Sequence, residues 1–175
     1  MSNDRLSLVI SVTINVVALV FLGAQLYLLR EQVRQAKDAY ISEQRRARKQ
    51  STLDFISATL ERRLRFQQEI PSVKDPEATL NFIRLAKTDE AAAKSILGFL
   101  NYYEYIAAGV NAGILDIDVI DSTMGTTVMR CQEGYVDFVA EVRERDSHPT
   151  LYEELDALAK LLRELRSTKF KARPH

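Results

Sequence analysis

Three polar side chains on predicted helices have the types and the spacing to act together: Asn101, Glu104 and Arg143. Asn101 and Glu104 are three residues apart, so on a helix both side chains project from the same face. Arg143 belongs to a later helix whose other face is apolar, and its guanidinium is the natural partner of the Glu104 carboxylate. Because no nucleophile accompanies these groups, we expect a structural polar network with a direct Glu104–Arg143 ion pair, which fixes the register of the helices. An active site built on Glu104 and neighbouring acids is the alternative.

The other potentially reactive groups have simpler interpretations. Asp116, Asp118 and Asp121 lie around the start of a predicted helix, where carboxylates cap the backbone and interact favourably with the helix dipole. A divalent-cation site is the alternative there. Cys131 is the only cysteine and falls on the apolar face of its helix, which predicts a small buried hydrophobe rather than a reactive thiol.

Short sequence signatures of catalysis are absent. The sequence contains no phosphate-binding glycine loop, dinucleotide-binding fingerprint, nucleophile elbow, zinc-protease motif or Cys-x-x-Cys pair. The two histidines are far apart in the sequence and give no metal-ligand cluster. We therefore expect no enzymatic activity, no metal and no cofactor. Lys and Arg total 24, as do Asp and Glu, and this balance gives no reason to expect a nucleic-acid partner.

The elements that position these residues are predicted to be helices. Six glycines, four prolines and the lack of sustained apolar–polar alternation favour an all-α fold. Apolar residues at helical spacing run from Ile96 to Val110 and from Met124 to Val142, which predicts two long core helices. Glycine in the segment 109–113 provides a helix C-cap. The predicted N-caps are Asp75 before Pro76, Thr88 or Asp89, Asp116 or Asp118, and a capping box of Thr150 with Glu153.

The N-terminal segment 6–29 is predicted to be a transmembrane helix. It has 24 residues without a formal charge, whereas roughly 20 suffice to cross the hydrocarbon core. A cleaved signal peptide is the competing interpretation, but the apolar run is longer than that of a signal peptide and no A-x-A pattern follows it.

The orientation of this span follows from its flanks. Basic residues near a span are retained on the cytosolic side, and here they follow the span rather than precede it. The first of them, Arg30, Arg34 and Lys37, lie close enough to contact anionic lipid head groups. We therefore expect a single-pass protein of the inner (cytoplasmic) membrane, with the N-terminus outside and the C-terminal domain in the cytosol.

A heptad-like apolar seam runs out of the span into the basic stalk that follows it. Steps of four and three residues alternate along the seam, which predicts parallel self-association. The alternative is a lone helix that packs this stripe against its own globular domain. The seam comprises Leu22, Leu26, Leu29, Val33, Ala36 and Tyr40.

The expected organisation is thus an all-α chain with an N-terminal transmembrane helix and a basic helical stalk, followed by a cytosolic helical bundle. Its segments are a short tail 1–5, the transmembrane helix 6–29, the stalk 30–50, the helical domain 51–166 and a basic tail 167–175.

Two stretches of the sequence resemble a known family. ILGFLNYYEYIAAGVNAGILD carries the pattern L-N-x-x-E-x-I-A-x-G followed by a G-I-L-D turn, and VAEVRERDSHPTLYEELDAL follows it. With these, the region from about 46 to 162 resembles the bacterial membrane-anchored family catalogued as domain of unknown function 4760. Tyr102 and Tyr103 stand where some members are expected to have Trp, a conservative difference. The resemblance implies an N-terminal span and a helical cytosolic domain, and no known reaction.

These features predict a membrane-tethered helical interaction or regulatory module whose partners are the lipid bilayer and a second protein or another copy of the chain. The alternative is a membrane effector, in which oligomerised transmembrane helices perturb the bilayer after the cytosolic domain senses a signal. Polar Thr13 and Asn15 within the span motivate this alternative.

Overall fold

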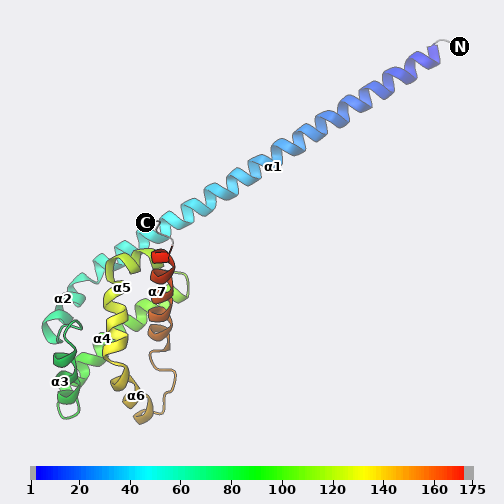
Figure 1. Ribbon diagram of the computed structural model, residues 1–175. Helices are drawn as coiled ribbons and strands as arrows, with labels where there is room; N and C mark the ends of the chain where they lie inside the picture. Colours follow the sequence, from blue (N-terminus) through cyan, green and yellow to red (C-terminus); the bar gives the residue numbers. More distant parts are fainter. Residues whose placement is uncertain (1–2, 172–175) are drawn as a thin grey trace. The chain divides into compact units, whose positions relative to one another are not determined.

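The computed structural model describes the backbone of residues 3–171 and, within it, the side chains of Leu19 and of residues 21–171. The regular elements of this part of the chain are all helices, joined by short linkers, and none is a strand (Figure 1), which confirms the all-α prediction. The helices are α1 (Asn3–Ala58), α2 (Leu60–Glu69), α3 (Pro76–Ala86), α4 (Glu90–Asn111), α5 (Ile117–Gly134), α6 (Val136–Arg145) and α7 (Glu153–Lys171).

The chain divides into two compact units, Met1–Arg46 and Ala47–His175. The described part of the first unit, residues 3–46, is the N-terminal part of α1, and it contains no second element on which to bury its apolar residues. Where its side chains are described, the apolar seam is exposed: Leu26 is 66% exposed and Val33 61%. The basic residues Arg30, Arg34 and Lys37 are exposed as well.

Among the residues that the structure describes, no helix is both long and apolar enough to cross a membrane. The transmembrane helix expected at 6–29 falls largely on side chains outside the described set, namely those of 6–18 and 20.

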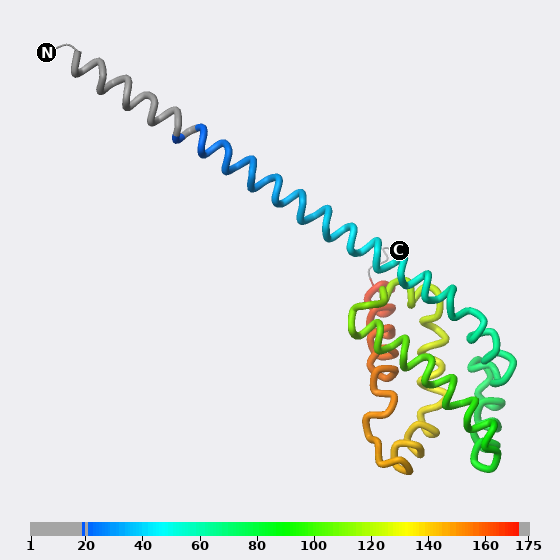
Figure 2. Tube along the Cα trace, turned by 180° about the vertical axis from the view of Figure 1, so that it is seen from behind, coloured from blue at the N-terminus to red at the C-terminus, as the bar shows by residue number. Residues whose placement is uncertain are grey.

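The second unit has one hydrophobic core centred on α4. This helix packs against α7, α3, α2 and α5, and α7 also packs against α5 (Figure 2). Aromatic rings fill the region between α2, α4 and the end of α5. The rings of Phe99 and Tyr103 meet edge to face at 4.9 Å between centroids, and Phe99 lies 5.8 Å from Tyr135.

Four local signals in the sequence set helix boundaries as predicted. The Asp75 side chain accepts from the amide of Ala78, with Pro76 in the first turn of α3. Asp89 caps α4 and Asp116 caps α5 in the same way. Gly113 follows the end of α4 with a φ of 71°, in the left-handed region that favours glycine.

Two boundaries differ from the sequence-based predictions. The helix expected from Met124 to Val142 is broken at Tyr135, where φ is −112° and ψ 10°. Its apolar period continues through the break because the Tyr135 ring is itself fully buried. The Thr150–Glu153 capping box is wrong: α7 begins at Glu153, directly after Tyr152 with a φ of 62°, and its first amides bind a side chain from α4.

Candidate functional site

A carboxylate from α4 caps the N-terminus of α7. The first amides of a helix lack acceptors within the helix and carry partial positive charge. The two Glu104 oxygens accept hydrogen bonds from the Glu154 and Leu155 amides, at 3.3 and 2.7 Å. These partners are 50 and 51 residues away in sequence, so this cap joins two core helices rather than neighbours in the chain.

Asn101, one turn before Glu104, binds the residue that precedes α7. The Tyr152 hydroxyl donates to Asn101 Oδ1 at 3.0 Å. Tyr152 is 3% exposed, and burial raises the pKa of its hydroxyl to about 12, with a smaller contribution from the Glu104 charge. The hydroxyl therefore stays protonated near neutral pH and acts as a donor.

Arg143 binds the same segment from the other side. Its Nε donates to the Leu151 carbonyl at 2.7 Å, and an Nη atom pairs with Asp156 at 2.8 Å. Gln132 donates to the second Asp156 oxygen at 3.1 Å.

The predicted direct Glu104–Arg143 ion pair is therefore wrong. Within the described residues, the two side chains bind different groups of the segment 151–156: Glu104 takes amides at the positive end of α7, and Arg143 takes a carbonyl and a carboxylate. The three residues singled out from the sequence do meet at one segment, with Asn101, Glu104 and Arg143 each bonded to it. The sequence did not predict that Tyr152 and Asp156 belong to this cluster. Tyr152 has a left-handed backbone, with a φ of 62°, and tyrosine is not a residue type that indicates such a conformation.

Burial and hydrogen bonding act in opposite directions on Glu104. Burial is the largest effect and raises the pKa of its carboxyl, whereas the amides of Leu155 and Glu154 lower it. The nearby carboxylates of Glu154 and Asp156 raise it further. A raised carboxyl pKa can mark a general acid. Here, however, both oxygens of Glu104 already accept hydrogen bonds from backbone amides. The geometry is that of a cap, which we call the α7 cap cluster: Asn101, Glu104, Arg143, Tyr152 and Asp156.

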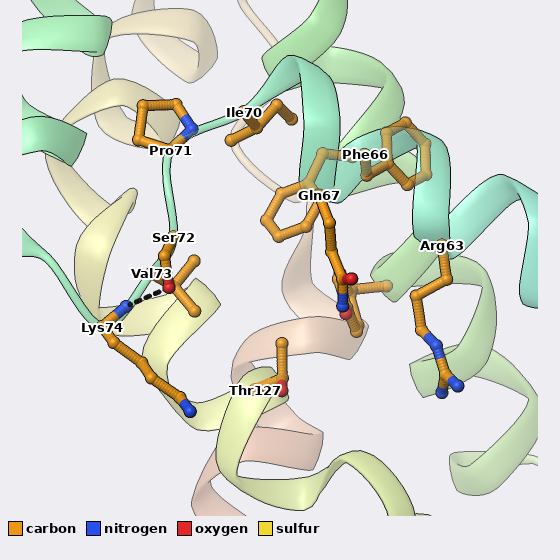
Figure 3. A pocket seen from close by; sticks show the side chains of 11 residues that line it. Arg63, Phe66, Gln67, Ile70, Pro71, Ser72, Val73, Lys74 and Thr127 are labelled. Atoms are coloured by element: carbon orange, nitrogen blue, oxygen red, sulfur yellow. Dashed lines mark hydrogen bonds between the residues drawn. The ribbon is translucent and has the colours of Figure 1, made fainter.

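A second polar site lies in a pocket of about 400 Å³ between α2, the linker that follows it, α4 and α5. Figure 3 shows Arg63 and Lys74 on opposite sides of this pocket, with Gln67 and Thr127 between them. Its apolar lining includes the rings of Phe66, Phe99 and Tyr103. Sequence reasoning missed this pocket because its residues come from three segments that lie apart in the sequence.

A comparison with protein-family models shows to which family the chain belongs. A family model described as Domain of unknown function (DUF4760) matches residues 9–162. The chain belongs to the DUF4760 family. This confirms the resemblance seen in the sequence; no curated protein and no solved structure matches the chain.

The acidic residues at the start of α5 in this DUF4760 protein have basic or backbone partners. Asp116 accepts from the amides of Asp118 and Val119. Asp121 pairs with Arg166 at 2.6 Å, and Lys169 lies 3.1 Å from Asp118. Three or more ligand-type side chains that could hold a metal ion are not found together anywhere in the described part of the chain.

Cys131 is fully buried in the core of the DUF4760 domain, as its spacing predicted. Burial raises the pKa of its thiol, which keeps the sulfur protonated. A thiol without access to solvent and without thiolate character is a packing residue rather than a nucleophile.

Proposed function

We propose that this DUF4760 protein is a membrane-tethered helical module that works through protein contacts and without catalysis. The observation that carries the proposal is the apolar face of the first unit. In the structure α1 leaves Leu22, Leu26 and Leu29 between 54% and 66% exposed, and the described residues of the unit include no second element that could cover them. Apolar side chains in such a row need either lipid or another protein.

The sequence around these leucines supports lipid as one of the two environments that cover them. The segment 6–29 has no formal charge, and the exposed side chains of Arg30, Arg34 and Lys37 come directly after it. Each basic residue held near an anionic membrane surface contributes about 1 kcal/mol of attraction. We propose a single pass through the inner membrane, with the N-terminus outside and the domain in the cytosol.

Extraction and reporter fusions test the tether. We expect the full chain to stay in the membrane fraction in alkaline carbonate and a C-terminal reporter to behave as cytosolic. A variant with Leu19→Lys and Phe21→Lys should be released, since a charge at the centre of a span costs about 3 kcal/mol. Release of the unchanged chain by carbonate, or periplasmic activity of the reporter, would contradict the proposal.

The contacts beyond the membrane are proposed to start with a second copy of the chain. Val33 and Tyr40 continue the seam into the stalk and are both 61% exposed. A parallel pair of α1 helices would bury these residues against their counterparts.

Cross-linking through single cysteines tests this pairing with a matched control. Val33→Cys should form a disulfide-linked dimer in membranes, while Gln35→Cys, two residues further on the helix and off the seam, should not. The buried Cys131 can stay in place because its thiol is inaccessible. Equal cross-linking at the two positions would count against the seam.

A further inference from the structure

The pocket between α2 and α5 is lined by five polar side chains that have no hydrogen-bond or ion-pair partner among the described residues. Arg63, Gln67, Lys74, Tyr103 and Thr127 line it, and none of their side chains forms a hydrogen bond or an ion pair with another residue in the described part of the chain. All five carry hydrogen-bond donors, and no Asp or Glu lines the pocket to neutralise the two cations. The pocket therefore presents two cations and several donors to whatever enters it.

Tyr103 contributes a hydroxyl to the wall of the pocket. The residue is only 2% exposed and belongs to the core, and its hydroxyl forms no hydrogen bond with another residue in the described part of the chain. Among the described residues, the buried side-chain oxygen that lacks a partner is that of Tyr135 and not that of Tyr103. The Tyr103 hydroxyl is therefore open to the pocket, where it can donate to a molecule that enters. Burial raises the pKa of this hydroxyl, and the Arg63 guanidinium lies near enough to lower it by a smaller amount.

The apolar lining defines the rest of the ligand. Phe66, Phe99 and Tyr103 contribute aromatic rings, with Ile70 and Val73 beside them. A volume of about 400 Å³ lies within the range of small-molecule sites. Such a site suits a compact molecule with an apolar or aromatic body and one anionic group.

We propose that this pocket binds a small organic anion, whose carboxylate or phosphate lies between Arg63 and Lys74 and whose apolar body contacts Phe99 and Tyr103. Arg63 supplies a planar pair of donors that matches either anion, and Lys74 supplies a point charge on the opposite side. The Tyr103 hydroxyl and the Thr127 hydroxyl complete the set of donors. This proposal does not depend on the membrane tether, so either can fail alone.

Ligand-observed fluorine NMR on the full chain in a neutral detergent tests the site. The probes are 4-fluorobenzoate and 4-fluorophenyl phosphate, which separate the two anions, and 4-fluorobenzyl alcohol serves as the neutral control. We expect at least one of the anionic probes to bind and the alcohol to bind at least about tenfold more weakly, as expected when a charged hydrogen-bonded group is lost.

Variants locate the binding. Arg63→Gln with Lys74→Gln should weaken the anionic probe by about tenfold to a hundredfold. Tyr103→Phe keeps the ring and should weaken it about threefold to tenfold. The matched control, Arg65→Gln with Lys160→Gln, removes the same charge from exposed positions outside the pocket and should leave the affinity unchanged.

Two results would overturn the proposal. One is the absence of binding by both anionic probes at about 10 mM, a concentration at which even a weak site would be occupied. The other is an affinity that falls equally in the pocket variant and in the matched control, which would assign the binding to general surface charge.

Discussion

The α7 cap cluster and the α2–α5 pocket both contain an arginine, a side-chain amide and a tyrosine, but only the cap cluster contains carboxylates, and the two regions differ in how their polar groups are paired. In the cap cluster, Glu104 binds two amides and Arg143 binds a carbonyl and a carboxylate. In the pocket, Arg63 and Lys74 have no such partner among the described residues. A paired polar group stabilises the fold, whereas an unpaired one at a cavity is available to a ligand. The two regions therefore differ in the pairing of their cations, because the cap cluster contains carboxylates and the pocket does not.

The largest expected effect is on the cap cluster. Glu104→Ala leaves two amides of α7 without an acceptor and should lower the free energy of unfolding by about 2–3 kcal/mol. Urea unfolding of the full chain, followed by far-UV circular dichroism, measures the loss. Glu104→Gln keeps one acceptor oxygen and should lose about half as much. As the control, Glu141→Ala removes an exposed carboxylate paired with Lys87 and should lower the free energy of unfolding by less than about 1 kcal/mol. An equal loss in Glu104→Ala and Glu141→Ala would contradict a special role of the Glu104 cap.

A double-mutant cycle tests which partner Arg143 has. Arg143→Ala should lower the free energy of unfolding by about 1–2 kcal/mol. The coupling energy between Arg143→Ala and Asp156→Ala should be about 1 kcal/mol, because this ion pair is only partly buried. Coupling with Glu104→Ala should be smaller, since the two side chains bind different groups. A coupling energy that is larger with Glu104 than with Asp156 would instead support a direct Glu104–Arg143 ion pair.

Tyr135 extends the comparison of paired and unpaired polar groups, because its hydroxyl is unpaired among the described residues but does not line the pocket. Its hydroxyl is buried and has no hydrogen-bond partner among the described residues. Removing an unsatisfied buried hydroxyl takes away a desolvation cost, so Tyr135→Phe should stabilise the domain by about 1 kcal/mol. A loss of that size in the same urea experiment would instead show that the hydroxyl has a partner such as a bound water.

The pH dependence of stability gives a smaller effect at Glu104. Burial raises its pKa above the ordinary value of 4.5, so the folded state holds the proton at a higher pH than the unfolded chain does. Protonation in this window therefore favours the folded state. The stability of the unchanged protein relative to Glu104→Gln should be lowest above the folded pKa and should rise as the pH falls towards 4.5. A relative stability that falls over the same range would mean that the amides, rather than burial, dominate.

The smallest expected effect belongs to the pocket. Because the Arg63 and Lys74 side chains form no hydrogen bond or ion pair within the described chain, replacing both with Gln should change the free energy of unfolding by no more than about 0.5 kcal/mol. A loss as large as that of Arg143→Ala would show that the pocket cations are structural, and the contrast between the two regions would fail.

Helix caps formed by residues next to the helix could be predicted from the sequence, whereas hydrogen-bond partners that come from another helix could not. Asp75, Asp89 and Asp116 cap the helices that directly follow them, so the sequence alone predicts them. The cap of α7 comes from Glu104 on another helix, and a local pattern at Thr150 was mistaken for it. Sequence reasoning selected Glu104 and Arg143 correctly as members of one cluster, but pairing them directly overlooked the backbone as a competing partner.

The cap of α7 also changes how its first turn should open. Amides in the first turn of a helix usually exchange with deuterium rapidly, because they lack acceptors and the ends fray. The Glu154 and Leu155 amides are bound to Glu104 on a core helix. Their exchange can proceed only when α7 separates from α4, so these two hydrogens should exchange as slowly as those within the core and report the opening of that interface.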